Sequence, residues 1–377
     1  MINRKRLVQQ FQTLVSIDAE SFHERKMADY VKGRLTDLGL QVEEDDKAET
    51  ILANNKVSSK DAAGNLYAVL PATGPGEPIL FGCHLDTVSP GNGKQAIVHE
   101  DGTITSDGTT VLGADDVSAI TEILEALTVI QEEKIPHPEI EVIAAAAEEP
   151  YAQGSRVFDY SKVHAKTAYV FDMSGPVGPA AIAAPSIISF QIEVRGRTAH
   201  AGFAPEAGIH AIQIAAAALS RIPNGHIDDQ TTVNIGTIHG GIGRNIVPDR
   251  VVMSGEIRSL SDETARGQLR KIRETFEQEA DRLGGEVEVQ SLQQFKAYRI
   301  SEDEEVVRRY REAGEKAGVP TSFVETFGGS DNNHYTENGI RGIVAACAMN
   351  KSHTTEEFTS VDDLERAAKL VYYLMTL

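Results

Sequence analysis

The stretch EVIAAAAEEP, residues 141–150, joins a short apolar run to two adjacent carboxylates, Glu148 and Glu149, and ends at Pro150. An apolar run of this length, closed by a proline, is typical of a strand buried on both faces. Neighbouring side chains on a strand point to opposite faces, so both carboxylates can serve one site only where the strand breaks. We therefore expect this pair at the end of a buried strand, with the break near Pro150.

Strands alternate with helices along the first part of the chain. The segments NLYAVL (65–70), PILFGC (78–83) and TAYVFD (167–172) are predicted to be strands, and the residues after 115–116 have the apolar spacing of a helix. The segment SFHE (21–24) matches a capping box at the start of another helix. This alternation predicts an α/β sheet with helices on both faces.

The pattern changes near residue 186. Between 186 and 298 the predicted order is strand, helix, strand, strand, helix, strand, which is the ferredoxin-like split unit. The α/β pattern resumes at residue 299. We therefore predict an α/β sandwich, residues 1–185 plus 299–377, into which a smaller ferredoxin-like α+β domain, residues 186–298, is inserted.

Composition excludes several classes of function. The formal net charge of −20 disfavours binding to nucleic acid or to an anionic membrane surface. No apolar run approaches the roughly 20 residues of a membrane-spanning helix. The chain has only two cysteines, Cys83 and Cys347, which suits a reducing cytoplasm better than a disulfide framework. We expect a cytoplasmic protein.

Histidines and carboxylates follow the predicted strands. The candidates are His84, Asp86, Asp115, Glu148, Glu149, Asp172 and His353. Each alone has an ordinary explanation, such as a helix cap or a solvated surface charge. Together they are expected at the crevice outside the carboxyl ends of the strands, where α/β sheets bind ligands. Carboxylates gathered there raise one another's pKa, and a divalent cation removes the conflict.

Two histidines with several carboxylates suit Zn²⁺, and Co²⁺ and Mn²⁺ are alternatives. Two metals that share a bridging carboxylate would hold a water between them and polarise a carbonyl. One carboxylate must then stay free to move protons, so one member of the pair 148–149 is expected to bind metal and the other to act as a base. Asp86 is expected to accept a hydrogen bond from the outer ring nitrogen of His84.

Six motifs carry a family resemblance. GCHLDTV, LGADD, AAEEP, VFD, GGSD and NKSHTTEEF resemble, in order and approximate spacing, the motifs of the aminoacylase and peptidase T group of di-zinc metallohydrolases. RGRTAHAG and GRNIVPDR resemble that group's inserted lid. The resemblance covers nearly the whole chain, and the branch that it resembles most is peptidase T, the tripeptide aminopeptidases. It implies a zinc-exopeptidase fold and a homodimer formed through the lid.

The resemblance also implies the roles of the metal ligands. His84 and Asp172 would bind one zinc ion, and Glu149 and His353 would bind the other. Asp115 would bridge the two ions, and in this group its bond to the following aspartate is often cis.

The same resemblance assigns the residues that act on substrate. Glu148 would be the general base and Asp86 would orient a histidine ligand. In the lid, His200 would stabilise the oxyanion, commonly in the active site of a dimer partner. Asn245 and Arg258 would hold a substrate carboxylate or carbonyl, with Arg258 the stronger candidate.

A backbone-lined substrate wall is implied at Gly329 and Ser330. The chain also departs from the family pattern. Phe327 stands where peptidase T typically has arginine, and Val117 and Tyr151 differ from many relatives. None of these departures affects an expected metal ligand or Glu148, but Phe327 bears on specificity for tripeptides.

Three functions are compatible with these residues. The first is a di-zinc aminopeptidase acting on tripeptides or similar short peptides. The second is a deacylase of N-acyl amino acids with the same centre, and the third is a non-catalytic metal-binding scaffold, which the intact Glu148 disfavours. Other histidines, such as His137 and His334, lie in polar surroundings and are expected on the surface.

Overall fold

The computed structural model describes all residues from 1 to 377, and the chain forms two compact units. The first contains Met1–Ala183, Arg299–Thr326 and Ser330–Leu377. The second contains Ala184–Tyr298 together with Phe327–Gly329. The three residues Phe327–Gly329 lie outside the predicted inserted segment, but by their contacts they belong to the inserted unit.

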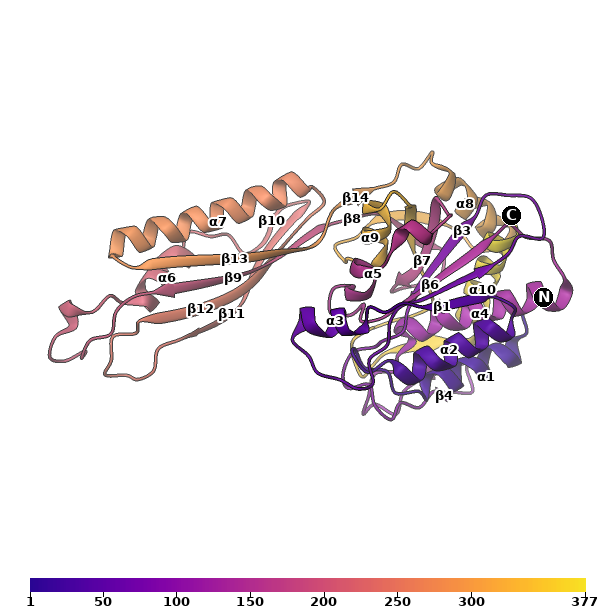
Figure 1. Ribbon diagram of the computed structural model, residues 1–377, viewed down its shortest axis with the longest axis horizontal. Coiled ribbons are helices and arrows are strands. Elements are labelled where there is room, and N and C mark those ends of the chain that lie inside the picture. Colours follow the sequence, from indigo (N-terminus) through magenta and orange to yellow (C-terminus); the bar gives the residue numbers. More distant parts are fainter. The chain divides into compact units, whose positions relative to one another are not determined.

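The first unit is built on a nine-stranded sheet (Figure 1). Its strands run in the order β1-β2-β6-β3-β7-β16-β8-β14, and β15 pairs with β8. The strands are β1 (Gln41–Glu44), β2 (Leu66–Leu70), β3 (Ile79–His84), β6 (Ile140–Ala145), β7 (Thr167–Met173), β8 (Pro179–Ala184), β14 (Tyr298–Arg299), β15 (Ser322–Glu325) and β16 (Arg341–Ala346).

Four central strands, β6, β3, β7 and β16, are parallel. Every residue of β3 and β6 is buried, as expected for parallel strands covered on both faces. The carboxyl ends of parallel strands lie at one edge of a sheet, so residues that follow these four strands converge there.

Helices cover both faces of this sheet (Figure 1). Helices α1, α4, α8 and α10 pack together on one face, and α5 and α9 lie on the other. The helices of this unit are α1 (Arg4–Val15), α2 (Arg25–Asp37), α3 (Ala48–Asn55), α4 (Ala114–Glu133), α5 (Gln153–Val157), η1 (Tyr160–Lys162), α8 (Glu305–Ala317), α9 (Asp331–Glu337) and α10 (Val361–Thr376). The protein has no helix that is both long and apolar enough to cross a membrane.

A small antiparallel sheet, in the order β17-β5-β4, completes the first unit. Its strands are β4 (Ile97–Val98), β5 (Thr103–Thr105) and β17 (Phe358–Ser360). Strand β17 leads directly into α10, which is N-capped by Ser360.

The second unit is an antiparallel sheet in the order β10-β11-β12-β9-β13. Its elements are β9 (Ser186–Arg195), η2 (Pro205–Ala207), α6 (Ala211–Leu219), β10 (Gly225–Asp228), β11 (Thr231–Gly240), β12 (Arg250–Ser259), α7 (Asp262–Leu283) and β13 (Glu286–Phe295). Without the short strand β10, this order is the ferredoxin-like arrangement, so the predicted fold class of this unit is confirmed.

Two histidines expected on the surface are buried. His137 and His334 are 3% and 5% exposed. The His334 ring contacts the Ser155 hydroxyl at 2.9 Å, and the His137 ring lies 2.7 Å from the carbonyl oxygen of Pro138. Polar neighbours in sequence therefore misled the prediction, because these rings find hydrogen-bond partners inside the protein.

The core of the second unit gives a test of its stability. Phe276 of α7 is fully buried in the cluster that contains Phe190, Ile214 and Met253. Phe276→Ala is expected to lower the free energy of unfolding of this unit by about 3–5 kcal/mol, because a large cavity replaces the ring. Chemical denaturation followed by circular dichroism measures the change. Leu292→Ala, at an exposed position of β13, is the control, and an equal loss in both variants would contradict this account.

Candidate metal centre

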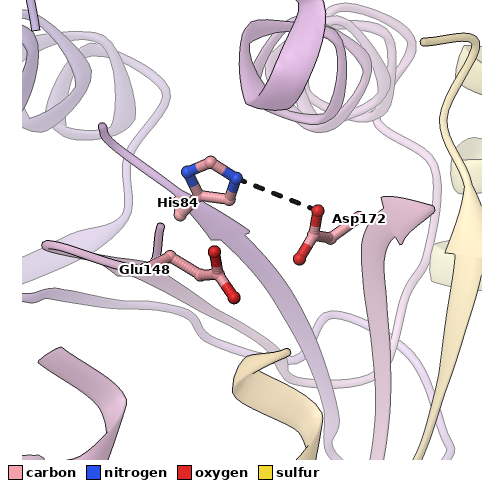
Figure 2. A group of neighbouring side chains, drawn as sticks. All are labelled: His84, Glu148 and Asp172. Carbon is pink, nitrogen blue, oxygen red and sulfur yellow. Dashed lines mark ion pairs between the residues drawn. The ribbon is translucent and has the colours of Figure 1, made fainter. Parts of the chain in front are cut away.

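The residues expected to bind metal come together at the carboxyl edge of the central strands. His84 is the last residue of β3, Asp172 lies near the end of β7, and the pair Glu148 and Glu149 follows β6. Figure 2 shows the side chains of His84, Glu148 and Asp172 facing a common space. The parallel topology therefore brings together groups that are far apart in sequence.

The chain leaves the extended conformation just before the glutamate pair. Ala147 has a φ of 49°, in the left-handed region, so the strand breaks before the pair and not at Pro150, as the sequence had suggested. The Asp86 carboxylate accepts hydrogen bonds from the backbone N–H groups of Glu148 (2.9 Å) and Glu149 (3.3 Å). These contacts explain how two adjacent carboxylates can serve one site: the backbone turns here around a buried acceptor.

The expected capping box at residues 21–24 is wrong. The Ser21 hydroxyl donates to Asp86 at 2.7 Å, and Glu24 makes no side-chain cap on α2. Glu24 accepts instead from the N–H groups of Phe22 (2.6 Å) and Ala147 (3.2 Å). Both side chains thus support the turn before the glutamate pair. A serine and a glutamate before a helix look the same in sequence whether they cap it or face a site.

His84 is oriented from both sides. Its Nδ1 lies 3.0 Å from the backbone oxygen of Asp86 and 3.3 Å from the carboxylate of the same residue. Its Nε2 lies 3.0 Å from Asp115 and 3.9 Å from Asp172. A proton on Nδ1, donated to Asp86, leaves Nε2 as the nitrogen that faces the carboxylates.

His353 approaches Asp115 from the opposite side. It lies in the loop between β16 and β17, and its Nε2 is 2.9 Å from Glu149 and 3.2 Å from Asp115. The two oxygens of Asp115 therefore face one histidine each, His84 and His353. The peptide bond between Asp115 and Asp116 is cis.

The electrostatics of the cluster reflect crowded carboxylates. Burial and the charge of Asp172 raise the pKa of Glu148 well above its ordinary value, and burial and the charge of Asp115 raise that of Asp172. Burial alone would raise the pKa of Asp115, but hydrogen bonds with the two histidines lower it. Hydrogen bonds to Asp115 and Glu149 raise the pKa of His353 to about 10. Without a cation, Glu148, Asp172 and His353 therefore hold protons more tightly than usual, and a bound cation would displace these protons.

These residues fit divalent cations. Oε1 of Glu149 is buried without a hydrogen-bond partner, although the other oxygen contacts His353. Ligand atoms of His84, Asp115 and Glu149 lie within 4.8 Å of one another, and so do those of His84, Glu148 and Asp172. Imidazole nitrogens with carboxylate oxygens are the ligands typical of zinc and related ions.

The expected lid residues His200 and Asn245 belong to the second unit. Their loops are neighbours, since the N–H of Ala201 donates to the backbone oxygen of Asn245 at 2.9 Å. The exposed His200 ring stacks on Phe203, and its Nδ1 accepts from the N–H groups of Gly202 and Phe203. The two residues form one exposed patch of the lid.

Arg258, also in the second unit, already has partners. It donates to the backbone oxygen of Phe327 and to the Glu256 carboxylate, both at 2.8 Å. Gly329 lies against the Phe295 ring, where a Cβ atom would come within 2.4 Å of a ring carbon. Arg258 and Phe295 of the second unit therefore hold the segment Phe327–Gly329 in place.

Ser330, which belongs to the first unit, begins helix α9. Its hydroxyl accepts from the N–H of Asn332 at 3.3 Å, and its own N–H donates to Asn333 at 3.1 Å. These bonds give Ser330 a structural role as a helix cap. Its expected contact with substrate stays a prediction.

Two family models match the chain. The model of the peptidase dimerisation domain matches residues 182–283, and the model of peptidase family M28 matches residues 65–200. The first match falls almost entirely within the second unit. The other contains four of the five candidate metal ligands, His84, Asp115, Glu149 and Asp172.

Similar proteins extend over the whole chain. The Bacillus subtilis protein YqjE is 38% identical over 98% of both chains. The crystal structure of aminopeptidase PepT from Bacillus cereus is 39% identical, with a TM-score of 0.91, and that of a Staphylococcus aureus tripeptidase is 34% identical, with a TM-score of 0.94. Each alignment covers 100% of this chain and 98% of the other. The chain belongs to the PepT family and is a metallopeptidase.

Proposed function

We propose that this protein is an aminopeptidase that removes the first residue of tripeptides and similar short peptides. The observation that carries the proposal is the cluster in which Asp115 lies between His84 and His353, with Glu148 beside it. The names of the Bacillus cereus aminopeptidase and the Staphylococcus aureus tripeptidase support the choice of substrate.

The proposed cofactor is a pair of Zn²⁺ ions per subunit, with Co²⁺ or Mn²⁺ as substitutes. His84 and Asp172 would hold one ion, Glu149 and His353 would hold the other, and Asp115 would contact both. The buried, unpartnered oxygen of Glu149 supports this assignment, because a cation satisfies a carboxylate that has no hydrogen-bond donor. Two such ions lower the pKa of a water molecule and polarise the carbonyl of the bond to be cleaved.

Glu148 is the proposed general base. Without metal, burial and the charge of Asp172 raise its pKa well above the usual value. It is the one carboxylate among Glu148, Glu149, Asp115 and Asp172 that is not assigned to a metal, so it is available to take and return a proton. Glu148 takes a proton from the attacking water as the water oxygen bonds to the carbonyl carbon. It then delivers this proton to the amine nitrogen as the C–N bond breaks.

Asp86 is proposed to act through its neighbours. It contacts His84 Nδ1 and accepts the N–H groups of Glu148 and Glu149. One buried carboxylate therefore orients a metal ligand and fixes the turn that carries both the base and a second ligand.

The lid is proposed to bind the substrate. His200 and Asn245 are exposed and adjacent, which suits contact with a peptide carbonyl or carboxylate. Arg258 holds the carbonyl of Phe327 and so supports the segment leading to Gly329 and Ser330, which we propose as the substrate wall.

We also propose that the protein is a cytoplasmic homodimer formed through the lid. The match to the peptidase dimerisation domain supports the dimer. So do three exposed isoleucines of the second unit, Ile212, Ile238 and Ile242, which are 40%, 53% and 78% exposed. The two cysteines are buried, unbonded thiols, which suits a reducing compartment.

A panel of substrates tests the proposed activity. The zinc-loaded protein is expected to cleave tripeptides with a free amino terminus, and to lose this activity when a chelator removes the metal. Product amino acids are measured by chromatography, with amino-blocked tripeptides, dipeptides and N-acetyl amino acids in parallel. Faster cleavage of N-acetyl amino acids would assign the protein to the deacylases and overturn the proposal.

Replacing the proposed base separates chemistry from metal binding. Glu148→Gln is expected to lower kcat by about 10²–10⁴-fold, because the amide cannot accept and return a proton. Metal content, measured by atomic emission, is expected to stay at the wild-type value. Glu100→Gln, at an exposed position, is the control. Activity near the wild-type value in Glu148→Gln would remove this residue from the mechanism.

The proposed dimer predicts a native mass of twice the chain mass of 40.8 kDa. The double substitution of Ile238 and Ile242 by aspartate is expected to produce a monomer, because it places charge at two of the exposed apolar positions of the second unit. Sedimentation velocity measures the mass. Val324→Asp, at an exposed position of β15 in the first unit, is the matched control and is expected to stay dimeric. A monomeric wild-type protein would contradict the proposal.

A further inference from the structure

The loop that carries His353 also carries Glu357, whose carboxylate contacts the backbone of Asp115. Glu357 is 1% exposed, although it lies in the polar segment SHTTEEF. Its Oε2 accepts the N–H of Gly113 at 2.6 Å, and its Oε1 accepts the N–H of Asp115 at 2.9 Å. The carboxylate thus binds the backbone on both sides of Ala114.

The start of helix α4 needs such an acceptor. Gly113 has a φ of 75° and provides no side-chain cap, and Asp115 and Asp116 have non-helical backbone angles. The N–H groups in the first turn of a helix have no partner within the helix. Glu357 supplies the acceptor from a segment more than two hundred residues away in sequence, so this helix start depends on the loop.

The loop itself is closed at its base. Asn350 and Phe358 exchange backbone hydrogen bonds of 3.0 and 3.1 Å, and Phe358 begins strand β17. Between these two residues the loop sends His353 to the side chain of Asp115 and Glu357 to its backbone. A single short loop therefore contacts both the side chain and the backbone of Asp115.

We infer that Glu357 is a positioning residue that sets the place of Asp115 between the two halves of the metal centre. This inference rests on the proposed function, because it takes Asp115 as the ligand shared by both metals. The Asp115 oxygens lie 3.0 Å from His84 and 3.2 Å from His353, so a shift of the Asp115 backbone changes both distances at once.

The neighbouring glutamate offers a matched control. Glu356 lies in the same loop, but its side chain is 74% exposed and pairs with Lys351 at 2.7 Å. Glu356→Gln therefore makes the same chemical change one residue away without affecting Asp115. Glu357→Gln keeps the size of the side chain, but its amide group places N–H donors against one of the two backbone N–H groups.

The experiment measures metal affinity on metal-stripped full-length protein. Zn²⁺ is titrated in competition with a chromophoric chelator, and Co²⁺ binding is followed by its visible absorption. Glu357→Gln is expected to weaken binding at one or both sites by about 10–100-fold, as when a residue behind a metal ligand is removed. It is also expected to alter the Co²⁺ spectrum, whereas Glu356→Gln should match wild type in both measurements.

A role limited to capping α4 would have a different signature. Glu357→Gln would then lower the melting temperature of the metal-free protein and leave the affinity and the Co²⁺ spectrum unchanged, which would overturn the inference.

Glu357→Asp, which keeps the charge, covers the case in which the glutamine variant does not fold. It is expected to recover part of the lost affinity, and wild-type affinity and spectrum in this variant would also overturn the inference. If wild-type protein binds fewer than two ions, the proposed function itself fails.

Discussion

Several carboxylates share a buried space at the carboxyl ends of four parallel strands, and the catalytic unit is organised around this constraint. Ionised carboxylates repel one another strongly where water is excluded. Burial and mutual charge accordingly raise the pKa of Glu148 and Asp172, while hydrogen bonds with two histidines lower the pKa of Asp115. Cations bound here would turn this repulsion into attraction, which links the stability of the site to metal binding.

The chain must also place two adjacent glutamates in one site. A regular strand would point them to opposite faces, and extending β6 would separate the ligand from the base. The left-handed conformation of Ala147 ends the strand before the pair, and Asp86 binds the two following N–H groups. Glu24 and Ser21 support that turn from another segment. Asp86 thus holds the backbone of the pair itself, while Glu24 holds the residue before it and Ser21 holds Asp86.

Much of this centre can be predicted from sequence, for a physical reason. Apolar runs such as those ending at His84 and before Glu148 mark strands buried on both faces, and parallel strands end at a common edge. Residues that hold the backbone are harder to find, because their effect depends on distant segments. Ser21 and Glu24 look like a helix cap, and Glu357 looks like a solvated charge beside Glu356. Only the folded chain shows which polar residue is buried.

The departure from the expected family pattern at Phe327 leaves the contacts of the metal centre unchanged. Arg258 binds the backbone oxygen of this residue, a contact that any side chain at position 327 preserves. The ring packs edge to face on His226, so the side chain is used within the lid. An arginine at this position would provide a charge for a substrate carboxylate, and phenylalanine does not. Arg258 donates through Nε to Glu256 and through Nη1 to the Phe327 carbonyl, so its second terminal nitrogen has no part in these two bonds; its contact with the peptide's carboxyl end, like those of Asn245 and His200, stays a prediction.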